Sequence, residues 1–183
     1  MRAFIAVELP PEVKKNIAGL VGDLKRIDAP VKWVEPENLH ITLKFLGEVE
    51  ESKIEKLIAL VSSAVAGTGS FNVKFEGIGK YPRVIWVGTG QGAEELCKIA
   101  SAVEKNLAKA GYQKEEREFK PHITIGRVKD QSQGEKGVDE LKEKIRSLKD
   151  PKFGAGMVDR ILVMQSTLTP NGPIYEKIKE VSL

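Results

Sequence analysis

Apolar and polar residues alternate along several short segments of the chain, which predicts strands, and recur every three or four positions along others, which predicts helices. The first alternation ends at two prolines, Pro10 and Pro11, which stop the strand and open a helix. The expected strands are 3–9, 32–34, 39–46, 71–75, 84–87, 119–128, 160–169 and 174–181. Four helices are expected. The first buries Val13, Ile17, Leu20, Val21 and Leu24, and the second buries Ile54, Leu57, Ile58, Val61 and Val65. The other two span 93–110 and 138–148.

Turn and capping signals separate these elements. Ser52 and Glu55 have the spacing of a capping box before the second helix, and the segments 67–70 and 131–137 have the composition of loops. Strands lie mostly beside strands, with helices inserted at intervals, so we expect an α+β fold with mainly antiparallel sheets. A chain of 183 residues is long enough to form one two-lobed domain over 1–183.

One four-residue pattern occurs twice. His40-Ile41-Thr42-Leu43 recurs as His122-Ile123-Thr124-Ile125, and each copy lies in an expected strand. The separation is too long for a solenoid repeat. It indicates two related lobes, each of which contributes one strand to a shared cleft.

Strand geometry gives this pattern a chemical meaning. Side chains alternate between the two faces of a strand, so His40 and Thr42 share one face, as do His122 and Thr124. Opening a cyclic phosphodiester requires a base for water on one side of phosphorus and an acid for the leaving oxygen on the other, and imidazole can serve in either role. The threonine hydroxyls could donate hydrogen bonds to the non-bridging oxygens. A histidine in a strand is more often structural, but the chain has only two, both in this context.

The same alternation sorts the two residues that follow the first motif. Lys44 shares the face of His40 and Thr42, which makes it a candidate phosphate contact; the alternative is a solvated charge. Phe45 falls on the opposite, core-facing side, so the pattern favours packing over base stacking.

Composition narrows the chemistry further. The chain has 29 basic and 26 acidic residues, and this slight excess does not itself indicate nucleic acid. Neither histidine has a second histidine or a cysteine at ligand spacing, so we expect no metal and no cofactor. The one cysteine, Cys97, lies in an expected helix, where a structural thiol is expected. Nucleophile-elbow and phosphate-loop motifs are absent from the sequence, which argues against serine hydrolase and ATP chemistry.

The N-terminal apolar run, residues 3–7, is too short for a signal peptide or a membrane span. We therefore expect a cytoplasmic protein without a membrane partner, and a monomer.

At this point the sequence resembles a known family, the RNA 2′,3′-cyclic phosphodiesterases, also called 2′-5′ RNA ligases, of the two-histidine phosphoesterase superfamily. Either His-x-Thr motif alone would be weak evidence, but the pair at this spacing is specific. The resemblance covers essentially the whole chain. It rests on segments 1–7, 40–47, 120–127 and 165–170, together with Trp33, Gly172, Tyr175 and Glu176.

The resemblance implies two pseudo-symmetric lobes that face a central cleft, with helices on the outside. It implies that His40 donates a proton to the leaving 3′ oxygen, that His122 activates water, and that the product is a 2′-phosphomonoester. Its implied partners are RNA ends with a 2′,3′-cyclic phosphate. Members also join tRNA halves through a 2′-5′ linkage, so ligation is an alternative main activity; a non-catalytic RNA- or nucleotide-binding module is a second alternative.

The resemblance also marks Arg127 as a phosphate contact. Strict alternation points Arg127 away from His122 unless Gly126 permits a bulge or the strand ends there. Tyr81, Arg83 and Trp86 could line the nucleotide side of the cleft, because aromatic rings stack on unpaired bases, but core or rim packing is favoured for them.

Overall fold

A computed structural model describes residues 1–129 and 136–183 of the chain. The strands are β1 (Arg2–Glu8), β2 (Val31–Trp33), β3 (His40–Glu48), β4 (Phe71–Tyr81), β5 (Val84–Thr89), β6 (His122–Val128), β7 (Lys152–Val158), β8 (Arg160–Thr169) and β9 (Gly172–Ser182). The helices are α1 (Pro11–Leu24), α2 (Ile54–Val65), α3 (Ala93–Lys109) and α4 (Lys136–Ser147), with 3₁₀ turns at Pro36–Asn38 and Glu51–Lys53. None of the described helices is both long and apolar enough to cross a membrane.

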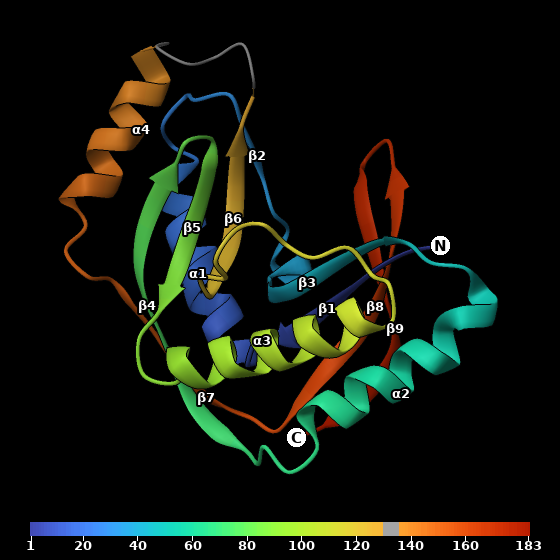
Figure 1. The fold of residues 1–183 in the computed structure, drawn as a ribbon. Coiled ribbons are helices and arrows are strands. Elements are labelled where there is room, and N and C mark those ends of the chain that lie inside the picture. Colours follow the sequence, from blue (N-terminus) through green and yellow to red (C-terminus); the bar gives the residue numbers. More distant parts are fainter. Residues whose placement is uncertain (130–135) are drawn as a thin grey trace.

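All strand pairs are antiparallel, and the strands form one curled sheet in the order β7-β4-β5-β6-β3-β1-β8-β9, with β2 paired to β6 (Figure 1). The β3 half of the sheet comprises β1, β3, β8 and β9, and the β6 half comprises β2, β4, β5, β6 and β7. The order β3-β1-β8-β9 on one side mirrors β6-β5-β4-β7 on the other. The two halves are therefore pseudo-symmetric about the boundary between β3 and β6.

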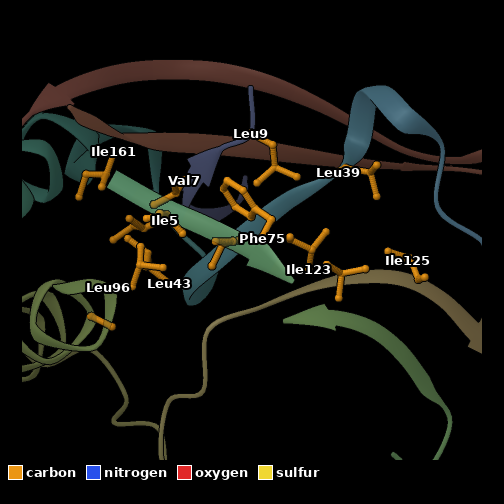
Figure 2. Close-up of a cluster of buried hydrophobic side chains, with 14 of the residues drawn as sticks. Ile5, Val7, Leu9, Leu39, Leu43, Phe75, Leu96, Ile123, Ile125 and Ile161 are labelled. Atoms are coloured by element: carbon orange, nitrogen blue, oxygen red, sulfur yellow. The ribbon is translucent and has the colours of Figure 1, made fainter. Parts of the chain in front are cut away.

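The helices pack against one face of this sheet. In the β6 half α1 packs on β7 and α4 on β4, whereas in the β3 half α2 packs on β9 and α3 on β3. This arrangement confirms the expected α+β class with antiparallel strands and outer helices. Helices and sheet share one buried apolar cluster, to which β1 contributes Ile5 and Val7, β3 contributes Leu43, and β6 contributes Ile123 and Ile125 (Figure 2).

Two local expectations are wrong. Ser52 and Glu55 do not form a capping box: Ser52 lies inside the 3₁₀ turn Glu51–Lys53, so Lys53 occupies the N-cap position of α2 and no side chain caps the helix. The strand β7 was not expected at all, because Gly154 and Gly156 interrupt its alternation. Gly156 is needed where it stands, since a Cβ there would lie 2.2 Å from Cγ of Pro10.

The expected polar loop 131–137 lies almost entirely outside the described residues, and α4 begins two residues earlier than expected, at Lys136. The other expected strands and helices are present with shifts of a few residues at their ends. The largest shift is in β4, which continues to Tyr81 rather than ending at residue 75.

Candidate active site

The two His-x-Thr segments lie side by side at the centre of the sheet. β3 and β6 are joined by the pair Ile41 and Ile123, and no other pair joins them in the described part of the chain. Because the strands run in opposite directions, His40 and His122 lie at opposite ends of this pair. Diagonal neighbours in an antiparallel ladder are about 7–8 Å apart. The fold thus brings the two histidines close together on neighbouring strands.

The faces of the two strands sort as the alternation predicts. His40, Thr42 and Thr124 are half-buried on the face opposite the helices, and His122 on that face is exposed. The intervening residues are buried in the core: Ile41, Leu43, Ile123 and Ile125. We call the face that carries the histidines the site face.

Both imidazoles are held by the same backbone contact. Nδ1 of His40 lies 2.7 Å from the carbonyl oxygen of Asn38, and Nδ1 of His122 lies 2.7 Å from that of Lys120. A carbonyl can only accept, so each Nδ1 carries the hydrogen and donates it. This contact fixes the tautomer and leaves Nε2 as the nitrogen available for proton transfer in each ring.

The two rings differ in their surroundings. The His40 ring centroid is 5.0 Å from that of Phe4 and 5.3 Å from that of Tyr175, and its Nε2 lies 2.9 Å from Oγ1 of Thr42. Burial lowers the pKa of His40; the Asn38 carbonyl opposes this, and the positive charge of Lys14 adds to it. His122 is exposed, so the two rings differ in burial.

A β-bulge overturns both expectations for the residues after the first motif. Thr42 pairs with Ala6, but Ile5 pairs with Lys44, so Leu43 is the extra residue and the alternation reverses. Lys44 therefore points to the core side. It is 3% exposed, and its Nζ lies 2.7 Å from Oε2 of Glu104 on α3 and 2.8 Å from the Gln113 carbonyl oxygen. Lys44 is a buried structural cation and does not share the face of His40.

Phe45 is displaced by the same bulge to the site face. Its partner on β1 is Phe4, whose ring centroid is 6.3 Å away, and the Phe45 side chain is 63% exposed. The expectation that Phe45 packs in the core is therefore wrong, and the cause is the extra residue in β3.

A matching bulge follows the second motif. Thr124 pairs with Trp86, but Gly126 pairs with the buried Ile85, so Ile125 is the extra residue. After it Val128 is buried and Arg127 is exposed on the site face. Arg127 is thus the pseudo-symmetric counterpart of Phe45. The bulge turns Arg127 to the same face as His122, whereas strict alternation would point it away.

Electrostatics place Arg127 near the His40 end of the site. Burial raises the pKa of the Tyr175 hydroxyl, and the positive charge of Arg127 opposes that rise. Tyr175 in turn contacts the His40 ring. The guanidinium is thus within electrostatic reach of Tyr175, which contacts the His40 ring.

Tyr81, Arg83 and Trp86, which could line the nucleotide side of the cleft, lie in three different environments. Trp86 shares the site face with Thr124, its register partner, and its ring packs so closely over Gly79 that a Cβ there would lie 2.2 Å away. Tyr81 is 77% exposed at the end of β4, and Nε of Arg83 donates to the Val128 carbonyl oxygen at 3.0 Å.

Sequence reasoning missed three functional neighbours of His40. Phe4 and Tyr175 contact its ring, and Lys14 of α1 contributes positive charge beside it. Tyr175 lies on β9, far from His40 in sequence, so no local spacing could place it there. The antiparallel return of β8 and β9 beside β1 brings it to the site.

The described residues contain no group of three or more His, Cys, Asp or Glu side chains that could hold a metal ion. Cys97 lies half-buried in α3, with its Sγ 3.8 Å from the carbonyl oxygen of Phe119.

Comparisons with known proteins match this arrangement. A family model described as the 2′-5′ RNA ligase superfamily matches residues 4–167. An RNA 2′,3′-cyclic phosphodiesterase of Methanocaldococcus jannaschii is 41% identical over 185 residues, covering 98% of this chain and 99% of the relative. A protein of the same name from Methanothermobacter thermautotrophicus is 36% identical over 180 residues, covering 96% and 95%. The crystal structure of Escherichia coli LigT complexed with 3′-AMP superposes with a TM-score of 0.81 at 26% identity, covering 100% of this chain and 97% of that one.

Proposed function

The chain belongs to the 2′-5′ RNA ligase superfamily, and from this membership we propose that it opens 2′,3′-cyclic phosphates at RNA ends to 2′-phosphomonoesters. Relatives that match nearly the whole chain are named RNA 2′,3′-cyclic phosphodiesterases. The observation that carries the proposal is the matched pair of imidazoles, each with Nδ1 hydrogen-bonded to a backbone carbonyl so that Nε2 is the nitrogen left for proton transfer; in His40 that Nε2 contacts Oγ1 of Thr42.

In the proposed reaction His122 Nε2 takes a proton from water as the water oxygen forms a bond to phosphorus. The bond between phosphorus and the 3′ oxygen breaks, and His40 Nε2 gives its proton to that oxygen. Thr42 and Thr124 donate hydrogen bonds to the non-bridging oxygens, and Arg127 balances their negative charge. Each general acid or base contributes about 10²- to 10⁴-fold to the rate.

The role of His40 as acid requires its imidazolium form. Burial lowers the pKa of His40 in the free protein, which favours the neutral ring. An anionic phosphate beside Nε2 stabilises the imidazolium and raises that pKa. Substrate binding and protonation of His40 are therefore coupled, and the site becomes reactive when the cyclic phosphate enters.

The proposed chemistry needs no metal and no cofactor, because both proton transfers and the charge balance use side chains of this chain. We expect full hydrolysis in EDTA. Strict dependence on an added divalent ion would contradict the mechanism.

The test follows an RNA oligonucleotide with a 2′,3′-cyclic end by phosphorus NMR, with wild type, His40→Ala and His122→Ala. We expect a 2′-phosphomonoester from wild type and a rate at least about 10²-fold lower for each variant. Far-UV circular dichroism establishes that the variants are folded, and Lys56→Ala on the exposed face of α2 is a control for a substitution outside the site. Undiminished turnover in either folded histidine variant would remove that residue from the mechanism.

A second activity uses the same displacement. If a 5′ hydroxyl replaces water, the product is a 2′-5′ linked RNA, the reaction for which the superfamily is named. The exposed setting of His122 supports this, because a large nucleophile must reach the side of phosphorus that His122 serves. RNA ends such as tRNA halves are the partners that we propose for both reactions.

A further inference from the structure

A cavity of about 530 Å³ lies beside the end of β3 that is remote from His40. Residues Lys44–Gly47 of β3 form one wall, and the segment 112–117 that follows α3 forms the other. Ligand sites for small molecules span about 300–1,000 Å³. The volume is therefore that of a binding site for a group such as a nucleoside.

The cavity is next to the His122 end of the catalytic pair. β3 pairs with β1 up to Glu48 but with β6 only at Ile41, so beyond that pair its edge towards β6 is open. The segment 112–117 faces this open edge, and the chain then continues directly to His122 at the start of β6. Arg127, at the other end of β6, lies on the opposite side of the pair.

Phe45 connects the cavity to the site face. Its ring is 63% exposed, and the Phe4 ring contacts both Phe45, at 6.3 Å, and His40, at 5.0 Å. The series of rings leads from the catalytic centre to the cavity wall. An aromatic face left open to water on this side can stack on an unpaired base.

A buried ion pair holds the opposite wall in place. Glu104 accepts from Lys44 Nζ through Oε2 at 2.7 Å and from the Glu115 backbone N–H through Oε1 at 3.2 Å. Lys44 also donates to the Gln113 carbonyl oxygen at 2.8 Å. The cavity is therefore formed in advance, because its wall is tied to both β3 and α3.

The geometry of in-line displacement indicates which group the cavity can hold. The nucleophile approaches phosphorus opposite the leaving 3′ oxygen, hence from the side of His122, which is the side of the cavity. On the cavity wall Lys114 and Arg117 are balanced by Glu115 and Glu116, and the remaining cation, Lys44, is neutralised by its ion pair with Glu104. A neutral nucleoside that ends in a 5′ hydroxyl fits this balance, whereas a terminal phosphate would require a net positive lining.

We propose that this cavity, with Phe45 as its stacking surface, binds the 5′-hydroxyl end of a second RNA strand. The inference rests on the proposed function, because it assigns the nucleophile side to His122. In the joining step the 5′ oxygen bonds to phosphorus and gives its proton to His122, while the bond from phosphorus to the 3′ oxygen breaks and that oxygen takes the proton of His40. The phosphate stays on the 2′ oxygen, so the linkage formed is 2′-5′.

The experiment compares Phe45→Leu with Met157→Leu, a change at an exposed apolar residue on the distant edge strand β7. One RNA carries a 2′,3′-cyclic end, and a short second RNA carries a 5′ hydroxyl and a blocked 3′ end. Hydrolysis of the first RNA is measured as the second is titrated, with joined product quantified on a denaturing gel. A bound second RNA displaces the attacking water and so inhibits hydrolysis. The apparent dissociation constant of the second RNA can therefore be obtained from this inhibition, even where little product is joined.

The rate of hydrolysis without the second RNA is measured for each of the three proteins and serves as that protein's own reference. The apparent dissociation constant of the second RNA should rise about tenfold or more in Phe45→Leu, because one stacking contact is lost. It should stay unchanged in Met157→Leu. Equal constants in wild type and Phe45→Leu, or no effect of the second RNA on wild-type hydrolysis, would overturn the inference. Loss of hydrolysis in wild type itself would instead count against the proposed function.

Discussion

Replacement of Lys44 by methionine tests whether this side chain points to the core, as the structure has it, or to the site face, as strict alternation predicts. The substitution keeps the aliphatic stem but removes the cation that pairs with Glu104 and donates to the Gln113 carbonyl oxygen. Removing one partner of a fully buried ion pair costs about 3–5 kcal/mol. The Glu104 side chain is 26% exposed and still accepts from the Glu115 N–H, so the cost should be lower, about 2–3 kcal/mol.

This loss can be measured as a change in melting temperature. A chain of 183 residues unfolds with an entropy of about 0.4 kcal/mol/K. The expected decrease in Tm for Lys44→Met is therefore about 5–8 °C by circular dichroism. Replacing Lys44 and Glu104 together by methionine should recover most of the stability, because no buried charge is then left alone. Lys56→Met on the exposed face of α2 should shift the unfolding free energy by about 0.5 kcal/mol or less.

Hydrolysis of a cyclic end, measured well below the melting transition, supplies the second readout. Because Lys44 points to the core, we expect its rate to change less than about tenfold, far less than the loss of a catalytic acid or base. A Lys44→Met protein with unchanged Tm and a rate about 10²-fold lower would show that Lys44 reaches the substrate and would refute the bulge in β3.

Three further predictions concern the site itself. The NMR titration of the two histidine rings, assigned with His122→Ala, should give His40 a midpoint below its ordinary value of 6.5, because burial lowers its pKa; a midpoint at or above 6.5 would contradict the buried environment. The unfolded chain protonates His40 near pH 6.5 and the folded chain only below it, so the stability that His40 contributes is complete above pH 6.5. This contribution is lost as pH falls through the folded pKa, and the unfolding free energy of wild type should decline relative to His40→Gln. Arg127→Met should lower kcat/KM about 10- to 100-fold through one lost charge-assisted contact, with Arg26→Met at an exposed position just after α1 as control. An unchanged value would remove Arg127 from the phosphate site.

The central strands could be predicted from the sequence because each motif carries a complete local signal. His40, Thr42 and their counterparts alternate with buried isoleucines, and this period alone sorts the two faces. The bulges carry no such signal. Leu43 and Ile125 are ordinary strand residues, and their extra position is defined only by the register against β1 and β5.

As a consequence the faces of Lys44 and Phe45 are both predicted wrongly, since one extra residue reverses the faces of the positions that follow it up to the next register shift. The contact of Tyr175 with His40 could not be predicted from the sequence for a different reason. It depends on the return of β8 and β9 to the N-terminal strand, which no neighbouring residue encodes.

The order of strands in the sheet also ties the first part of the chain to the last. β4, from the first part of the chain, lies beside β5 in the β6 half, and β8, from the last part, lies beside β1 in the β3 half. A chain severed in the turn after β4 would yield a first fragment that contains β1 and β3 but lacks β8 and β9 of the β3 half, and a second that contains β5, β6 and β7 but lacks β2 and β4 of the β6 half. Neither fragment would complete either half of the sheet by itself, so the two halves depend on each other for their hydrogen-bonded strands.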